Sequence, residues 1–249
     1  MERPGIVISK TERRYIKTLV AHYAKNRSFI EVMLKQIADA ILGSHNLMAH
    51  VHSTKWRLKD SRHLEGKLLR KLVEAKKKRK RFTISEKNLF YRINDLAGFR
   101  ILHLHTQQII PIDRELRAVF KEYRFPLFEK PKARTWDDES REFYRRAGIR
   151  PIKSPKMYTS VHYVVESNSS TKATCEIQVR TLAEELWGEV DHTMNYPHES
   201  SILACREQIK VLARVTSSCS RLVDSIFRSA EFGNRQAGKR LATRLPALR

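Results

Sequence analysis

The stretch SPKMYTSVHYVVESNSSTKATCEIQVRT, residues 154–181, decides the fold because it holds two strand-like runs separated by a short polar segment. The runs MYTSVHYVVE and ATCEIQVRT predict two neighbouring strands paired as a hairpin. Side chains two positions apart share a strand face, so Ile177 and Val179 are expected to point into the core. The other faces carry polar side chains that packing alone would not require: Tyr158, Ser160 and His162, then Glu176, Gln178 and Arg180.

The segments around this hairpin predict an alternation of helices and strands. Residue spacing predicts helices over 10–44, 61–81, 111–123, 182–194 and 200–227, and strands over 50–60 and 98–105. Ser61 is the expected N-cap of the second helical region. This order fits an α/β (α+β) fold, with a mixed central sheet of about five strands flanked by helices. We expect an N-terminal helical extension (1–48), a central domain (49–200) and a C-terminal helix with a basic tail (201–249).

Three segments have weaker local signals. Residues 129–157 are polar and basic, and they predict a long loop that contains at most a short helix. The apolar stripe from Ile202 to Ile226, which includes Cys205 and Cys219, predicts a helix face in the core, bracing the sheet or forming an oligomer interface. The tail from residue 233 is basic and is expected to be loosely ordered.

Composition narrows the classes of function. The chain has 249 residues and a formal net charge of +22, which predicts polyanionic partners such as nucleotides or RNA. No apolar run approaches the roughly 18 residues of a membrane span. The N-terminus lacks a secretory apolar segment, so we expect a cytoplasmic protein without membrane association. Three cysteines without CxxC spacing argue against a disulfide framework or a zinc site.

The charged residues fit phosphate chemistry without a glycine-rich loop. Neither a Walker A motif nor a G-x-G-x-x-G motif is present, so side chains would have to hold any phosphates. Such a site needs cations for the phosphates, carboxylates for a divalent metal and a base for an attacking hydroxyl. The candidates are Arg57, Lys59, Lys67, Asp95, Arg100, Glu176 and His162.

Each of these residues also has a structural interpretation. Alone, His162 is more often a hydrogen-bonded structural histidine, Asp95 could cap a turn, and Glu176 with Arg180 could form a weak ion pair. The functional interpretation therefore depends on the whole set.

Five motifs in order, RLKDSRHLEGKL (57–68), DLAGFR (95–100), YTSVH (158–162), EIQVRT (176–181) and WGEVDH (187–192), resemble those of RelA/SpoT-type nucleotide pyrophosphotransferases, the alarmone synthetases. The resemblance covers residues 50–200 and implies a nucleotidyltransferase-like synthetase fold. It also implies a reaction, in which the β,γ-pyrophosphate of ATP moves to the ribose 3′-hydroxyl of GDP or GTP and AMP leaves.

The resemblance also assigns roles to individual residues. It implies Asp95 and Glu176 as carboxylates for Mg²⁺, with Glu176 as the base for the acceptor hydroxyl. The implied ATP contacts are Arg57, Lys59, Lys67 and Arg100, and the implied acceptor contacts are Tyr158, His162, Gln178, Lys153 and Lys156. Two carboxylates suffice because Mg²⁺ keeps water and substrate phosphate in its shell.

One departure leaves alternatives open. The family commonly has Gly-Tyr-Arg where this chain has Met157-Tyr158-Thr159, which leaves the acceptor phosphate contacts in question. The alternatives are a toxin that pyrophosphorylates the 3′-terminal adenosine of tRNA, a producer of adenosine alarmones, and a nucleotide- or RNA-binding module without activity. The length suggests a stand-alone synthetase without a hydrolase domain. Homo-oligomer formation and an antitoxin partner stay open.

Overall fold

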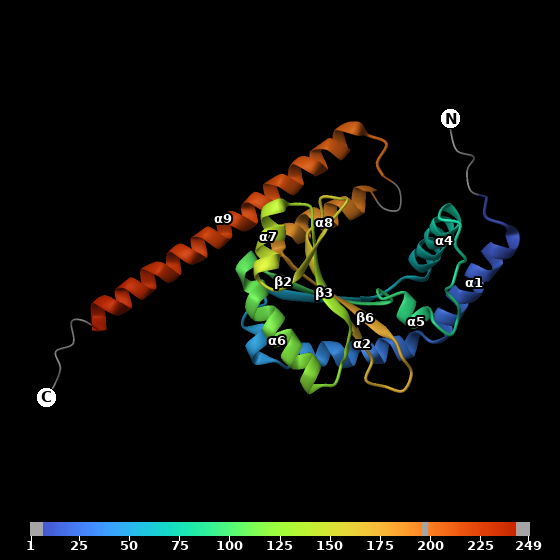
Figure 1. The fold of residues 1–249 in the computed structure, drawn as a ribbon, viewed down its shortest axis with the longest axis horizontal. Helices are drawn as coiled ribbons and strands as arrows, with labels where there is room; N and C mark the ends of the chain where they lie inside the picture. The colour runs from blue at the N-terminus through green and yellow to red at the C-terminus, as the bar shows by residue number, and fades with distance from the viewer. Residues whose placement is uncertain (1–6, 196–198, 243–249) are drawn as a thin grey trace.

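The computed structural model describes residues 7–195 and 199–242 and arranges them around one six-stranded sheet (Figure 1). The strands are β1 (Ser53–Leu58), β2 (Ala97–His103), β3 (Leu127–Thr135), β4 (Arg150–Lys153), β5 (Ser160–Glu166) and β6 (Thr174–Thr181). They lie in the order β1-β2-β6-β5-β3-β4. The predicted mixed α/β architecture is confirmed, with six strands in place of about five.

Helices lie around this sheet, and most of them share one core with it, whereas Trp187 packs with Ile209 and Ala213 in a separate cluster. They are α1 (Lys10–Lys25), α2 (Arg27–Leu42), α3 (His45–Met48), α4 (Ser61–Lys77), α5 (Leu89–Arg92), the 3₁₀ turn η1 (Thr106–Gln108), α6 (Ile109–Glu122), α7 (Asp138–Arg146), α8 (Leu182–Asn195) and α9 (Leu203–Ala242). Buried apolar side chains of α1, α2, α4 and α6 join those of β2, β5 and β6 in a single cluster. In Figure 1, α1 and α4 lie together at one end, and α9 extends past the other.

The predicted hairpin is present and occupies the middle of the sheet. β5 and β6 are antiparallel, with His162 opposite Gln178 and Tyr163 opposite Ile177. On its other side, β6 pairs in parallel with β2. The alternation holds in the middle of β6, because Ile177 and Val179 are buried while Glu176 and Gln178 stay partly exposed, but Arg180, expected on the polar face, is buried. Tyr158, which was expected to share the first strand with His162, lies just before β5 begins.

Helix α4 carries Lys67 and begins at Ser61, as expected, but its N-cap is the residue before. Its N-cap is Asp60 and not Ser61: Asp60 Oδ1 accepts hydrogen bonds from the backbone N–H groups of Arg62 (2.8 Å) and His63 (3.2 Å). A carboxylate at this place satisfies unpaired amides and faces the positive end of the helix dipole. The cap fixes where α4 begins and so where Lys67 points.

The segment 129–157 is structured, which corrects the expectation of a long loop. β3 runs through it to Thr135, α7 follows, and β4 ends at Lys153. β3 alternates small buried residues with exposed charged ones: Ala133 and Thr135 are buried, and Arg134 between them is exposed. The buried positions of β3 do not carry the large apolar residues that usually indicate a strand. The pairing of β3 with β5 is also irregular between Leu127 and Lys132, which makes the strand harder to predict.

Helix α9 buries a different face from the one predicted. Ile202, Val215, Leu222 and Ile226 are exposed, as is Cys219, and Cys205 is only partly buried. The buried face carries Ile209, Ala213, Thr216, Ser220 and Asp224. Its polar members are paired: Ser220 Oγ lies 3.0 Å from Thr181 Oγ1, and Asp224 Oδ1 lies 3.0 Å from His105 Nδ1. The expected loosely ordered tail is helical as far as Ala242, and 243–249 lie outside the described residues.

Candidate active site

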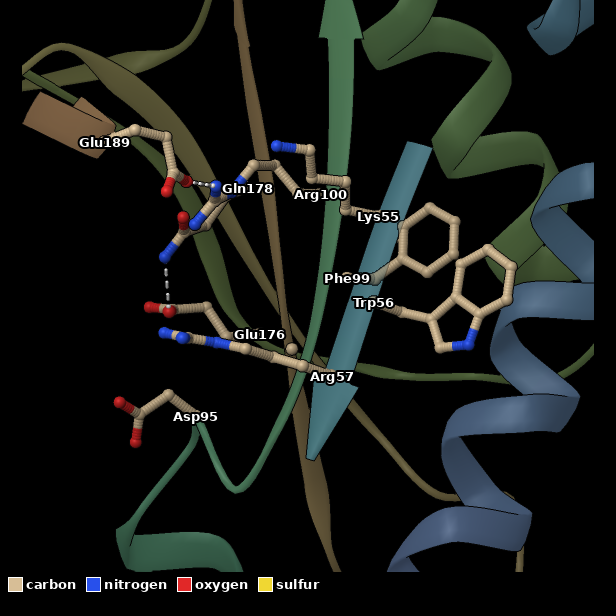
Figure 2. A pocket seen from close by; sticks show the side chains of 10 residues that line it. Lys55, Trp56, Arg57, Asp95, Phe99, Arg100, Glu176, Gln178 and Glu189 are labelled. Carbon is tan, nitrogen blue, oxygen red and sulfur yellow. Dashed lines mark hydrogen bonds and ion pairs between the residues drawn. The ribbon is translucent and has the colours of Figure 1, made fainter. Parts of the chain in front are cut away.

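Two carboxylates from distant parts of the chain meet in one cavity. Asp95 lies in the turn before β2, and Glu176 lies on β6, the parallel neighbour of β2. The cavity measures about 290 Å³. Its lining residues are Lys55, Trp56, Arg57, Asp95, Gly98, Phe99, Arg100, Glu176, Gln178 and Glu189. Figure 2 shows the side chains of Arg57, Asp95 and Glu176 extending to the same side of the sheet.

Asp95 is held by two lysines that the sequence had singled out. Lys59 Nζ lies 2.8 Å from Oδ2, and Lys67 Nζ lies 2.7 Å from Oδ1. Burial raises the pKa of Asp95, but Lys67 and Lys59 outweigh this effect and hold the pKa below its ordinary value. Asp95 is therefore ionised at neutral pH. In this structure Lys59 and Lys67, which the resemblance implied as ATP contacts, form ion pairs with Asp95.

Glu176 is held by its neighbours on the hairpin. Its Oε1 lies 3.0 Å from His162 Nδ1, and its Oε2 accepts a hydrogen bond from Gln178 Nε2 at 2.9 Å. Burial raises the pKa of Glu176, but the hydrogen bond from His162, with a smaller contribution from Gln178, overcomes this and the pKa is lowered. Glu176 is thus a carboxylate at neutral pH, able to bind a cation or accept a proton.

A line of hydrogen bonds connects Glu176 to Tyr158. Tyr158 Oη lies 3.2 Å from His162 Nε2, and His162 Nδ1 faces Glu176. A neutral His162 protonated on Nδ1 satisfies both contacts, because Tyr158 then donates to Nε2 and Nδ1–H donates to the carboxylate. The three residues that the hairpin pattern indicated therefore act as one connected group.

Arg57 on β1 and Arg100 on β2 line the same cavity as the two carboxylates. Arg57 is exposed on β1, and Arg100 Nη1 contacts Glu185 Oε1 and Glu189 Oε1, each at 2.6 Å. Lys55 lines the same cavity and was missed by the sequence analysis. The signal was available, since Lys55 lies two positions before Arg57 on the same strand face.

A second cavity of about 250 Å³ opens beside the first and contains the expected acceptor residues Tyr158, Gln178 and Lys156. The buried guanidinium of Arg180 lies 5.7 Å from the Tyr158 ring centroid, within the range of a cation–π contact. The Trp187 ring also lies near Tyr158, with the two ring centroids 6.3 Å apart. Lys153, at the end of edge strand β4, is exposed and lines neither of these two cavities.

The two carboxylates provide the oxygen donors that Mg²⁺ prefers. Asp95 Oδ1 is buried and accepts no hydrogen bond of good geometry, although Lys67 Nζ is close to it. A buried carboxylate oxygen in the same cavity as a second ionised carboxylate fits a hard cation that also binds substrate phosphate, provided that Lys67 moves aside. No group of three or more His, Cys, Asp or Glu side chains arranged to hold a metal occurs among the described residues. Water and substrate oxygens would complete the coordination shell.

A cleft with two ionised carboxylates and cations from several strands and helices defines a class of proteins that handle nucleotide phosphates. The motifs and the fold make the class more specific. The chain belongs to the RelA/SpoT family, because a family model described as the region found in RelA / SpoT proteins matches residues 56–201.

Solved structures share this fold. A GTP pyrophosphokinase family protein from Streptococcus pneumoniae is 15% identical, with a TM-score of 0.54 over 91% of this chain and 97% of its own. Small alarmone synthetase 1 from Bacillus subtilis bound to AMPCPP is 18% identical, with a TM-score of 0.54 over 86% of this chain and 98% of its own. The same synthetase bound to its product pppGpp is 20% identical, with a TM-score of 0.51 over 86% and 96%.

At these identities the similarity shows the fold alone. A comparison with curated proteins found no match. Within the described residues, no helix is both long and apolar enough to cross a bilayer.

Proposed function

We propose that this protein transfers the pyrophosphoryl group of ATP to the ribose 3′-hydroxyl of GDP or GTP, giving a guanosine alarmone and AMP. The observation that carries this proposal is the convergence of Asp95 and Glu176 in one cavity with Arg57 and Arg100. Family membership supports pyrophosphate transfer in general, and the choice of acceptor is part of the proposal.

ATP would occupy the cavity on the β1 and β2 side. Arg57 and Arg100 are suited to the adenine and the phosphates, because a guanidinium stacks on rings and pairs with phosphate oxygens. Lys59 and Lys67 would turn from Asp95 toward the phosphates once a cation binds there. These contacts position the β-phosphorus and neutralise its charge, which supplies most of the rate in phosphoryl transfer.

Asp95 and Glu176 would hold a magnesium ion together with the phosphates. When bound, this ion neutralises charge on the transferred group and its leaving oxygen. We infer that the cavity requires it, because the two carboxylates alone would repel a polyanion.

The acceptor would occupy the second cavity, with its base against Tyr158. Glu176 takes the proton from the 3′-hydroxyl while the 3′-oxygen forms its bond to the β-phosphorus. The bond between that phosphorus and the α,β-bridging oxygen breaks, and AMP leaves with the oxygen. His162 orients Glu176 through the 3.0 Å contact and connects it to Tyr158, so the base and the ring platform are held together.

A basic surface favours RNA as a second candidate acceptor. Lys76 Nζ bonds Glu12 Oε2 at 2.7 Å, which brings the end of α4 beside α1. The exposed cations gathered there are Lys10, Arg13, Arg14, Lys17, Lys77, Lys78, Arg79, Lys80 and Arg81. Such a surface fits an RNA backbone, as in modification of a tRNA 3′ end. A nucleotide acceptor needs no contact with these cations at the α1–α4 end of the molecule. Dependence of the reaction on this surface would therefore distinguish an RNA acceptor from a nucleotide acceptor.

The deciding experiment incubates the purified protein with γ-labelled ATP and each of GDP, GTP, ADP, ATP and bulk tRNA. We expect label to appear in the GDP or GTP product, with little change in rate between low and moderate salt. Label in tRNA, lost steeply as salt rises, would establish the RNA alternative. AMP release that is the same in wild type and Glu176→Gln would reject the mechanism, and an absence of transfer to every acceptor would leave a binding module.

A further inference from the structure

Arg100 contacts two carboxylates of the same helix at the same distance. Its Nη1 lies 2.6 Å from Glu185 Oε1 and 2.6 Å from Glu189 Oε1, and both glutamates belong to α8. They are four positions apart and so lie on one helix face. The contacts look alike, but the surroundings of the two carboxylates differ.

Glu185 is a fixed, buried counter-charge. Its side chain is 8% exposed, it also bonds Lys55 Nζ at 3.0 Å, and it forms an ion pair with Arg180, whose side chain is 3% exposed. Burial opposes ionisation, but Arg180, Lys55 and Arg100 together lower the pKa of Glu185 to about 2. Removing this carboxylate would leave a buried guanidinium unpaired, which is costly.

Glu189 is placed differently. Its side chain is 53% exposed, and Figure 2 shows its carboxylate joined to Arg100. It lines both the cavity of the metal carboxylates and the cavity of Tyr158. An exposed ion pair contributes little free energy, so this contact is easily exchanged for another anion.

A phosphate oxygen and a carboxylate oxygen accept the same charge-assisted hydrogen bond from a guanidinium. We propose that Glu189 occupies, in the free protein, the place on Arg100 that a donor phosphate takes when nucleotide binds, while Glu185 stays in contact with Arg100 and anchors it. The inference rests on the proposed function, because it takes the cavity to be the ATP site.

The proposal predicts opposite effects for two equivalent substitutions. Glu189→Gln removes the competing carboxylate and its repulsion of the polyphosphate, so nucleotide should bind roughly two- to fivefold more tightly. Glu185→Gln removes the anchor of Arg100 and leaves Arg180 unpaired, so nucleotide should bind more weakly and the melting temperature should fall. A purely structural role for Glu189 would leave nucleotide affinity unchanged.

Calorimetric titration with AMPCPP and Mg²⁺ measures the affinity without needing turnover or an acceptor. Glu74→Gln is the matched control, because Glu74 is an exposed carboxylate paired with Lys78 at the far end of α4. We expect the control to bind as wild type does. The gain for Glu189→Gln should shrink as salt is raised, since screening weakens the repulsion it removes.

Glu189→Gln is a surface change, so its result stands even if Glu185→Gln fails to fold. Unchanged or weaker AMPCPP binding in Glu189→Gln overturns the proposal, as does equal tightening in both variants. If wild type binds no AMPCPP, the proposed function fails first, and the two failures are therefore distinguishable.

Discussion

Replacing Glu184 by glutamine should change how the stability of the protein depends on pH. The Thr181 N–H donates to Glu184 Oε2 at 2.9 Å and the Glu184 N–H bonds Thr181 Oγ1 at 3.2 Å, a reciprocal cap at the start of α8. Burial raises the pKa of Glu184 to about 7 from 4.5, despite the hydrogen bonds with Thr181 that lower it. The carboxyl is therefore more easily ionised in the unfolded chain than in the folded one.

This difference in pKa makes the folded protein less stable as the pH rises. Below pH 4.5 both states are protonated and Glu184 costs nothing; as the pH rises from 4.5 to about 7, the unfolded chain ionises first and stability falls. The loss is at most ~3 kcal/mol, because each pKa unit is worth about 1.4 kcal/mol and the residue keeps some exposure to solvent. Glutamine can accept the same bond from Thr181 but cannot ionise.

Urea unfolding followed by tryptophan fluorescence between pH 4.5 and 8 measures the effect. The free energy of unfolding of Glu184→Gln minus that of wild type should rise by ~2–3 kcal/mol across this range and level off above pH 7. Attraction between an ionised Glu184 and the positive end of the α8 dipole would act the other way. A difference that stays flat with pH, or a wild type that is more stable than the variant at pH 8, would refute the reasoning.

Three further predictions concern the active site. Glu176→Gln should lower the rate of AMP release by about 10²- to 10⁴-fold in a labelled-ATP assay while leaving the melting temperature within a few degrees of wild type. Gly188→Ala should raise the KM for the acceptor and lower the melting temperature, because an added Cβ would overlap the guanidinium of Arg180; unchanged kinetics would show that Arg180 can move freely. Asp60→Ala should lower the midpoint of urea unfolding through loss of the α4 cap, whereas Asp60→Asn should keep the midpoint close to that of wild type.

The central part of the fold was predictable because its strands follow simple patterns. In β6, large β-branched and apolar residues alternate with polar ones, so both the strand and its buried face could be predicted. The carboxylates Asp95 and Glu176 could be paired in advance only through the resemblance of their motifs to a family. Spacing alone does not show that the turn before β2 lies beside the beginning of β6.

The predictions that were wrong or missing concern β3, α9 and Glu189, and each has a physical cause that the pattern of a single sequence does not show. β3 was missed because Ala133 and Thr135 are too small to mark a buried face. On α9, the apolar stripe predicted a core contact, but the helix is held through Ser220 and Asp224, which bond partners far away in the sequence. Glu189 was overlooked because a lone acid on a helix becomes informative only when Arg100 is seen beside it.

The position of β6 constrains when during synthesis the site can exist. β6 is the last strand of the sheet in sequence, yet it lies between β2 and β5 at its centre. Until the ribosome has made β6, β2 has no partner on one edge. Glu176 is then also absent, so Asp95 has no second carboxylate beside it. A nascent chain therefore cannot carry out the proposed chemistry until β6 has emerged and inserted, so nucleotide consumption would begin only after most of the polypeptide has been made.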